Sequence, residues 1–499
     1  MKELLNVPPL ERMKTGIRGF EHISLGGLVR GRTTLLVGTS GSGKTLFATE
    51  LVHRAITESG NSAVFVTFEE KPADIVRNVR QLGWDLSEQI QQKKLIILDA
   101  SMDRTIVEEA GAYDLSGIIT QIVDAIQEVG AQLVILDSLG ALFYQFENPG
   151  ILRREILRLT DELRDLGVTS IMTAERVEEY GPITRFGIEE FVSDCVVVLR
   201  HQLLDEKVRR TIQIYKLRGD RHYKDEFPFT IETPGIVILP LSAAELTQSS
   251  TANRVSFGSR SLDEMAGGGL FQDSVILISG PTGSGKTLMG TTFASEACRR
   301  GERVLFLGYE ESRPQLMRNA HSWGLEFDEW EKSGLLKTVC QYPEALGLEG
   351  HLYAIEREIE QFRPTRLVID SISAMERVGS VRNFREFVIG LTGFVKQQQV
   401  CTLLTSSSAS LSGGDSITDA HISTITDAIV LLRYVERAGA LSRGIIIIKM
   451  RGSQHDNRFH EFSISDKGLE IGEPFVHVPT ALLGIASSRS DLDVPPKRA

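Results

Sequence analysis

Two eight-residue stretches have the composition and spacing of a phosphate-binding loop. GTSGSGKT and GPTGSGKT, at Gly38–Thr45 and Gly280–Thr287, both fit G-x-x-x-x-G-K-[ST]. In such a loop the glycines let backbone amides wrap phosphates, the lysine offsets their charge, and the final hydroxyl can ligate Mg²⁺. Each stretch follows an apolar run and opens a helical pattern, so we predict two nucleotide sites. Their loop residues are Thr39, Ser40, Gly41, Ser42, Gly43, Lys44, Thr45 and Leu46, and Thr282, Gly283, Ser284, Gly285, Lys286, Thr287 and Leu288.

Two aspartates end apolar runs at positions where a metal-associated carboxylate is expected. Asp137 closes LVILD and Asp370 closes RLVID. An aspartate at the end of a strand is more often a helix cap, so this interpretation depends on the phosphate loops. We predict that Asp137, Asp370, Thr45 and Thr287 bind Mg²⁺, together with Glu310.

A pair of glutamates follows one apolar run in each half of the chain. Glu69 and Glu70 stand in VTFEE, and Glu310 and Glu311 in LGYEE. A carboxylate at a strand end can polarise an attacking water or hydroxyl, although such pairs are commonly only solvated. Because the pair recurs in both halves, we favour the catalytic interpretation.

Cations follow a later apolar run in both halves. Lys216 and Arg218 stand in IQIYKLRG, and Lys449 and Arg451 in IIIIKMRG. In a closed ring these cations could reach the γ-phosphate of a neighbouring subunit, as arginine fingers do. A basic cap on a strand explains them equally well.

These parallels are part of a duplication of the chain. Residues 19–50 align without a gap on residues 261–292, and the later motifs recur in the same order. A polar segment rich in Ser and Thr, 241–256, separates the copies. We expect a first domain at 1–245, a second at 246–471, and a C-terminal tail at 472–499.

Short β-rich runs alternate with helical stretches within each copy. In the first copy these runs are TTLLVG, AVFVTF, LIILDA, LVILD, TSIMTA and CVVVL. The alternation predicts an α/β fold with a mostly parallel sheet flanked by helices. Ligands should then collect at the carboxyl ends of the strands.

Composition narrows the possible partners and compartments. The 499 residues carry a net charge of -11, which disfavours nucleic acid as a partner. The four cysteines show no CxxC or zinc spacing and read as core residues of a reducing cytosol. With no signal-length or membrane-spanning apolar run, we expect a cytoplasmic protein and no membrane association.

Taken together, the motifs resemble the KaiC family of two-domain RecA-like ATPases and autokinases. The resemblance is carried by the two loops, FEE, YEES, KLRGDRH, SITDAHISTITD, KMRGSQHD and EFSISDKG, from about residue 16 to 468. It implies tandem RecA-like P-loop NTPase domains in a homohexamer of two rings, with ATP between adjacent subunits. Slow hydrolysis is implied for the first ring and phosphotransfer for the second.

The resemblance also implies roles for single residues. Glu69, Glu70, Glu310 and Glu311 match catalytic carboxylates, Ser423 and Thr424 match phosphoacceptors, and Thr418 matches a hydroxyl that assists phosphate exchange. Positions that match nucleotide contacts are Lys216, Leu217, Arg218, His222, Trp323, Arg443, Lys449, Met450 and Arg451.

The family implies two protein partners, and each would act on a different part of the chain. A KaiB-like protein is expected to dock on the first ring, although the segment Ser101–Ser116 departs from the clock pattern. The family's tail, on which KaiA acts, is not recognisable after Gly472, which makes KaiA a doubtful partner. The alternatives are a RecA-type DNA-dependent ATPase, which shares the fold, and a scaffold that binds ATP only to assemble.

The phosphoacceptor pair occurs in only one copy. When the halves are aligned through KLRG and KMRG, Ser423 falls opposite Glu190 and Thr424 opposite Phe191. A requirement of the fold would place similar residues in both copies. We therefore interpret HISTITD as a regulated site, in which a phosphate on Ser423 supplies charge that Glu190 already carries.

Overall fold

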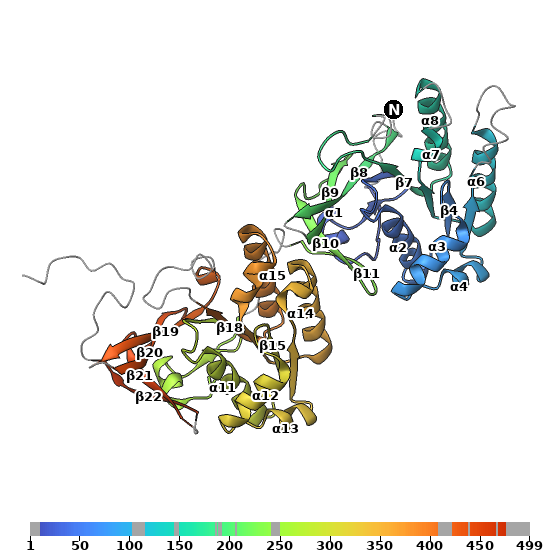
Figure 1. Cartoon of the computed structure of the whole chain (residues 1–499). Coiled ribbons are helices and arrows are strands. Elements are labelled where there is room, and N and C mark those ends of the chain that lie inside the picture. Colours follow the sequence, from blue (N-terminus) through green and yellow to red (C-terminus); the bar gives the residue numbers. More distant parts are fainter. Residues whose placement is uncertain are drawn as a thin grey trace, which may run out of the picture. The chain divides into compact units, whose positions relative to one another are not determined.

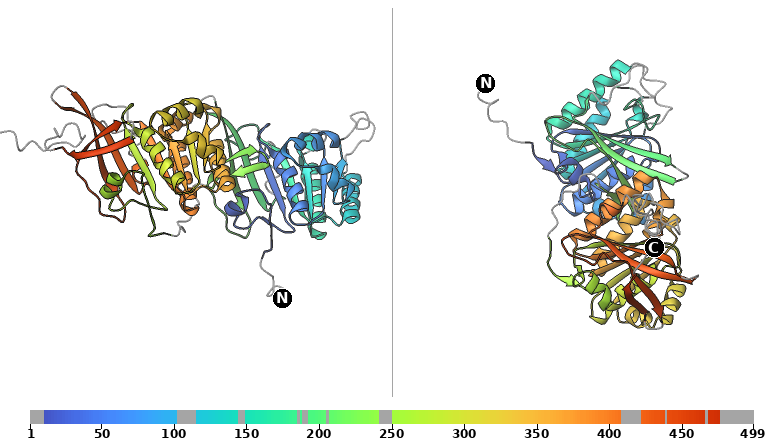
Figure 2. Two further views of the ribbon diagram at one scale, coloured as in Figure 1. Left: turned by 90° about the horizontal axis from the view of Figure 1, so that it is seen from below. Right: turned by 90° about the vertical axis from the view of Figure 1, so that its left-hand side faces the viewer.

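The computed structural model describes residues 10–101, 115–143, 149–184, 187, 192–204, 207–240, 250–407, 422–437, 440–465 and 468–475. The chain divides into two compact units, Met1–Ala243 and Ala244–Ala499. Each unit is a helix-flanked sheet, shown in Figure 1 and from two further directions in Figure 2. This confirms the predicted α/β fold with duplicated RecA-like domains.

The first unit contains a nine-stranded sheet whose parallel part holds the phosphate loop. Strands β8, β3, β7, β6, β4 and β5 are parallel, whereas β9, β10 and β11 add antiparallel strands beyond β8. In sheet order the strands are β11 (Gly235–Ile238), β10 (Glu226–Glu232), β9 (Lys207–Leu217), β8 (Cys195–Leu204), β3 (Thr33–Gly38), β7 (Thr169–Glu175), β6 (Leu133–Asp137), β4 (Ala63–Thr67) and β5 (Leu95–Asp99).

Helices cover both faces of this sheet because successive strand residues point to opposite sides. Leu36, Phe65 and Ile135 pack on one face, and Leu35, Val64 and Val134 on the other. The first face is covered by α1 (Phe20–Ser24), α2 (Lys44–Thr57), α3 (Pro72–Val79) and α4 (Leu86–Gln91), the second by α6 (Ser116–Val129) and α8 (Pro149–Asp165).

The second unit repeats this order strand for strand. Its helices include α10 (Arg260–Met265), α11 (Lys286–Arg299), α12 (Arg313–Ser322), α13 (Phe327–Lys332), α14 (Leu348–Phe362) and α15 (Val381–Gln397). Its sheet runs β16 (Leu336–Cys340), β15 (Val304–Gly308), β17 (Arg366–Asp370), β18 (Cys401–Ser407), β14 (Val275–Gly280), β19 (Ala428–Arg437), β20 (Ala440–Met450), β21 (His460–Ser465) and β22 (Gly468–Pro474).

Two details of the second unit differ from a simple reading of the sequence. Arg254 and Val255, in the polar segment between the copies, form the short strand β12, which pairs with β13 (Leu270–Phe271). Two residues are too few to show a strand period. Strand β22 continues to Pro474, so the sheet includes the first residues of the expected tail.

Some residues and segments that the sequence analysis singled out lie outside the described part of the chain. These are Thr418, Glu190, Phe191, most of Ser101–Ser116 and the tail from residue 476. Within the part of the chain that the structure describes, no helix combines the length and apolar character needed to cross a bilayer.

Candidate functional site: two phosphate loops and a distant phosphoacceptor edge

The first phosphate loop joins β3 to α2 in the conformation that its glycines permit. Gly41 and Gly43 have φ of 76° and 101°, in the left-handed region that glycine adopts most readily. Lys44 is buried, and its Nζ donates to the carbonyls of Gly38 and Thr39 at 3.0 Å each. Burial lowers the pKa of Lys44. The ammonium is therefore held over the loop at the N-terminus of α2, where phosphate binds.

The second loop, between β14 and α11, has the same geometry. Gly283 and Gly285 have φ of 77° and 104°, and Lys286 Nζ donates to Gly280 and Pro281 at 2.9 and 3.0 Å. The hydroxyl of Ser284, like that of Ser42 in the first loop, is buried without a partner among the residues that the structure describes. An unpartnered buried donor in each loop fits a phosphate ligand.

The predicted metal residues come together in both units. Thr45 Oγ1 donates to Asp137 at 2.8 Å, and Thr287 Oγ1 donates to Asp370 at 2.7 Å. Burial raises the pKa of Asp370. A hydroxyl and a carboxylate are hard oxygen ligands that suit Mg²⁺ completed by phosphates and water. Within the described ranges, no group of three or more His, Cys, Asp or Glu side chains able to hold a metal occurs.

The glutamate pairs adjoin these aspartates, and the members of each pair differ. Ser138 Oγ donates to Glu69 at 2.9 Å, and Ser371 Oγ donates to Glu310 at 2.9 Å. The second members, Glu70 and Glu311, have raised pKa values.

Burial is the main cause of these two shifts, followed by the charge of Asp137 near Glu70 and of Asp370 near Glu311. A carboxylate with a raised pKa is a better proton acceptor for a hydroxyl or water. We therefore expect the first member of each pair to be oriented by a serine and the second to act as base.

In the first unit these groups line one cavity of about 360 Å³. Both the phosphate loop and the carboxylates contribute to its lining. The lining residues are Ser40, Gly41, Gly43, Lys44, Thr45, Leu46, Glu69, Glu70, Asp137, Ser138 and Glu175. The cavity lies at the carboxyl ends of the parallel strands, as expected for this topology.

The other predicted nucleotide contacts are more scattered. Arg443 lies 6.0 Å from the ring of Tyr434, whose hydroxyl donates to Thr282 in the loop at 3.3 Å. Trp323 packs at the end of α12, and Met450 ends β20 against the same core. Leu217 and His222 are at and after the end of β9, and burial lowers the pKa of His222.

The predicted phosphoacceptors, Ser423 and Thr424, lie at the amino ends of the parallel strands, which we call the phosphoacceptor edge. The loop of their own unit lies at the carboxyl ends of the same strands. Strand β19 runs parallel to β14 with Ala428 beside Ile276. Ser423 and Thr424, which come before β19 in the chain, therefore lie beyond the amino end of β14. The loop follows the other end of β14, at Gly280. Six strand residues span roughly 20 Å at about 3.3 Å each.

The predicted cations of the second unit share the phosphoacceptor edge. Lys449 Nζ donates to the carbonyls of Ser423 and Thr426 at 2.6 and 2.7 Å, and Arg451 donates to Thr424 at 2.8 Å. Burial and the charge of Arg451 lower the pKa of Lys449. In the first unit Lys216 donates to Ser193 at 2.8 Å, at the corresponding edge. These cations therefore face away from the nucleotide loop of their own unit.

Several site residues were not predicted from the sequence. Thr173 and Thr405 donate to Asp137 and Asp370, and Thr39 donates to Glu179. The two threonines occupy equivalent positions in TSIMTAE and CTLLTSS, so the repeat contained a signal for them. Glu179 had no such signal, because it lies in a loop after β7 and meets Thr39 only in the folded chain.

Comparison with known proteins identifies relatives along nearly the whole chain. The family model described as "ATPase: KaiC" matches residues 13–243 and 255–475. The circadian clock oscillator protein KaiC of Prochlorococcus marinus is 51% identical over 93% of this chain and 93% of its own length. Circadian clock protein KaiC3 of Synechocystis sp. is 52% identical over 95% of this chain and 94% of its own.

KaiC of Synechococcus elongatus is also similar, at 52% identity over 93% of this chain and 90% of its own length. Both phosphate loops, with their threonine and aspartate partners, lie inside the matched residues. The chain therefore belongs to the KaiC family of ATPases.

Proposed function

We propose that the chain hydrolyses ATP in both units and phosphorylates Ser423 and Thr424 in the second, acting as a homohexamer with Mg²⁺. The observation that carries this proposal is the separation of the second unit into two edges. The loop, Asp370 and the glutamate pair lie at one edge of the sheet, and the hydroxyls with Lys449 and Arg451 at the other. Reacting atoms must approach to about 3–3.5 Å, which roughly 20 Å of strand forbids within one unit.

The chain solves this problem if the two edges meet across a subunit interface. A ring of identical subunits places the phosphoacceptor edge of one subunit against the loop edge of the next, a heterologous contact that closes on itself. Lys449 and Arg451 would then face the γ-phosphate held by the neighbouring loop. The same reasoning applies to Lys216 and Arg218 in the first unit.

The residues divide the phosphotransfer step among themselves. Thr287 and Asp370 would hold Mg²⁺, which would offset the negative charge of the bound nucleotide's phosphates. Glu311 takes the proton of the Thr424 hydroxyl of the adjacent subunit, and that oxygen bonds to the γ-phosphorus. The bond from the γ-phosphorus to the β-γ bridging oxygen breaks, and ADP leaves.

Two further assignments complete the proposal. The relatives are named as circadian clock proteins, which supports a role in a clock-type signalling system. A KaiB-like protein is the proposed partner, and KaiA is a doubtful one because the family's tail is not recognisable after Gly472. The rival function is a RecA-like DNA-dependent ATPase, which the net charge of -11 disfavours.

Phosphosite mapping tests the proposal. The purified chain is incubated with γ-labelled ATP and Mg²⁺, and the label is located by mass spectrometry. We expect phosphate on Ser423 and Thr424, none on either residue in Lys286→Ala, and continued ATP hydrolysis in that variant through Lys44. ATP hydrolysis by the wild-type chain without phosphate on either residue would contradict the proposed autokinase activity and support an ATPase activity only.

A further inference from the structure

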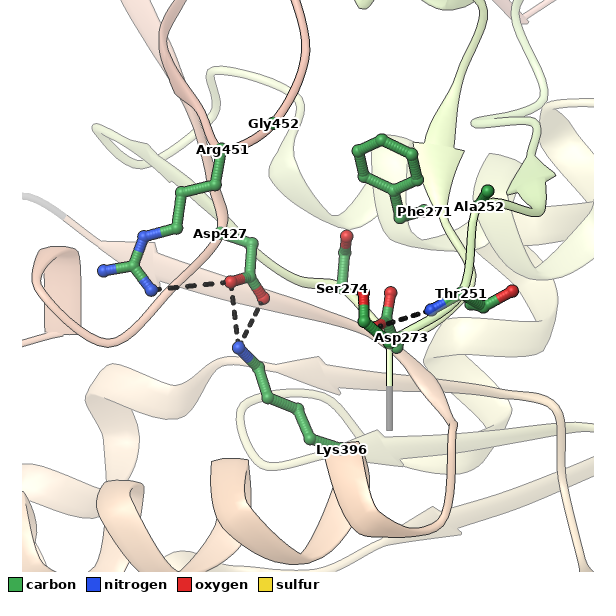
Figure 3. Close-up of a pocket in the computed structure, with 10 residues that line it drawn as sticks. Thr251, Ala252, Phe271, Asp273, Ser274, Lys396, Asp427, Arg451 and Gly452 are labelled. Atoms are coloured by element: carbon green, nitrogen blue, oxygen red, sulfur yellow. Dashed lines mark hydrogen bonds and ion pairs between the residues drawn. The ribbon is translucent and has the colours of Figure 1, made fainter. Parts of the chain in front are cut away.

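One aspartate in the second unit joins three elements at the phosphoacceptor edge. Asp427 directly precedes β19, and its carboxylate lies 2.8 Å from Lys396 Nζ of α15 and 3.6 Å from a guanidinium nitrogen of Arg451 (Figure 3). Its Oδ2 also accepts from the backbone amide of Val275, at 2.9 Å. Asp427 therefore links a helix, two strand ends and the predicted interface arginine.

The first unit contains the same arrangement with different residues. Asp194, directly before β8, lies 2.8 Å from Arg164 of α8 and 3.9 Å from Arg218. The backbone amide of Arg218 donates to the Asp194 carbonyl at 2.9 Å, and that of Arg451 donates to the Asp427 carbonyl at 2.8 Å. The arrangement has persisted in both copies although the helix cation is arginine in one and lysine in the other.

Distance divides the two cations on each aspartate into different roles. The helix cation is at hydrogen-bonding distance, whereas the strand-end arginine is beyond it, with a side chain 54% exposed at Arg451 and 55% at Arg218. The aspartate side chains are only 17% and 10% exposed. The carboxylate is thus fixed by the helix and attracts the arginine without locking it.

Arg451 also has room to move. A cavity of about 560 Å³ opens beside it, lined by Phe271, Asp273, Lys396, Asp427 and Gly452 among others (Figure 3). The guanidinium donates to the Thr424 carbonyl at 2.8 Å, and without the Asp427 charge this bond would have to hold a long, half-exposed side chain, whose ordering on binding costs entropy. Asp427 lowers that cost by keeping the guanidinium at the edge.

We propose that Asp427 and Asp194 are positioning residues that orient Arg451 and Arg218 toward the nucleotide of the neighbouring subunit. This inference rests on the proposed function, because it assumes that the two arginines act across the interface. Asp427 contacts Lys396, Val275 and Arg451, and of these three only Arg451 is a predicted nucleotide contact, so we assign the effect of Asp427 to the arginine.

The competing explanation is that Asp427 only caps the start of the sheet. Asp427→Asn separates the two, because an amide oxygen still accepts from Val275 while the negative charge is lost. We expect Asp427→Asn to form the hexamer and to bind ATP with unchanged affinity, while its rate of phosphorylation at Ser423 and Thr424 falls about 10-fold. Asp328→Asn, on the exposed surface of α13, is the matched control.

A double-mutant comparison decides whether Asp427 acts through Arg451. In an Arg451→Ala background, Asp427→Asn should cause no further loss of rate, because the group that it orients is gone. Losses that multiply, or a wild-type rate in Asp427→Asn, would overturn the inference and leave the proposed function intact. A wild-type rate in Arg451→Ala would instead contradict the cross-subunit role in the proposed function.

Asp427→Glu provides the test if the asparagine variant does not assemble. This variant keeps the charge but moves the carboxylate by one methylene, so we expect a loss of about 3-fold that disappears in the Arg451→Ala background. If the loss of rate persists in the Arg451→Ala background, Asp427 has only a structural role, and the inference is overturned.

Discussion

At the scale of single residues, the two members of each glutamate pair have different surroundings, and we infer different roles for them. Glu310 accepts from Ser371, whereas Glu311 accepts from Asn319 at 3.1 Å and adjoins Asp370. Burial, then the charge of Asp370, raises the pKa of Glu311. The sequence predicted both residues as catalytic, and the structure adds a physical reason to treat Glu311 as the base.

The raised pKa makes a prediction about stability. A carboxyl group with a raised folded-state pKa stabilises the fold below its unfolded pKa and loses that contribution as the pH rises through the folded value. In nucleotide-free protein with EDTA, Glu311→Gln should therefore melt about 2 °C above wild type at pH 8.

The difference should close as the pH falls below about 4.3, where the unfolded glutamate protonates. Thermal melting of the two proteins across this range provides the measurement, with the exposed Glu329→Gln as control. A wild type that melts higher than Glu311→Gln at pH 8 would contradict the assigned environment.

At the scale of elements, β17 of the second unit carries a buried charge that the first unit lacks. Arg366 has no exposed side-chain surface and bonds to Glu302 at 2.9 Å and to the Ser256 carbonyl at 2.7 Å. Its equivalent in the first unit is Leu133, also fully buried. The fold therefore accepts an apolar residue at this position.

Removal of Glu302 should expose the cost of that charge. Glu302→Ala leaves the Arg366 guanidinium buried without its carboxylate, and we expect a loss of about 2–3 kcal/mol in the free energy of unfolding. In the double variant with Arg366→Leu much of that loss should return. Urea unfolding followed through Trp323 and Trp330 fluorescence measures both, and equal losses in the single and double variants would contradict the assignment.

The elements were largely predictable, whereas their junctions were not. Apolar runs predicted strands such as β3 and β6 because their residues are buried on both faces. The short strand β12 was missed because two residues have no period. Asp427 was missed because its role depends on α15, more than 30 residues earlier, and on β20, which follows β19.

In the candidate site, too, contiguous motifs were predictable from the sequence, whereas contacts between distant residues were not. Phosphate loops are contiguous, so spacing alone predicted Lys44 and Lys286. The contacts of Thr173 and Thr405 with the aspartates arise from β7 and β18, and strand pairing, which sequence does not display, brings them together. The opposite placement of Ser423 and the loop likewise follows from parallel pairing of β14 with β19.

At the scale of the whole molecule, charge separates the two functions that this fold supports. A net charge of -11 opposes binding to a phosphate backbone. We expect ATP hydrolysis to change less than 2-fold when single-stranded DNA is added at low salt. A several-fold stimulation that disappears as salt is raised would favour the RecA-like function instead.

The duplication also assigns different tasks to similar units. Both retain a loop, a threonine-aspartate pair and an arginine paired with an aspartate, which are the parts that the proposed function uses for hydrolysis. Adjacent hydroxyls at the cation edge occur only in the second copy, at Ser423 and Thr424. Under the proposed function, both units hydrolyse ATP and only the second is modified.

Mixed subunits test most directly whether the phosphotransfer site is shared between neighbours. One subunit carries Lys286→Ala with Ser423 and Thr424 intact, and a second, of different mass tag, carries Ser423→Ala and Thr424→Ala with Lys286 intact. Neither should phosphorylate itself alone. After the two are mixed and reassembled with labelled ATP, we predict phosphate on the Lys286→Ala subunit; its absence from verified mixed rings, with wild-type rings active, would contradict transfer across the interface.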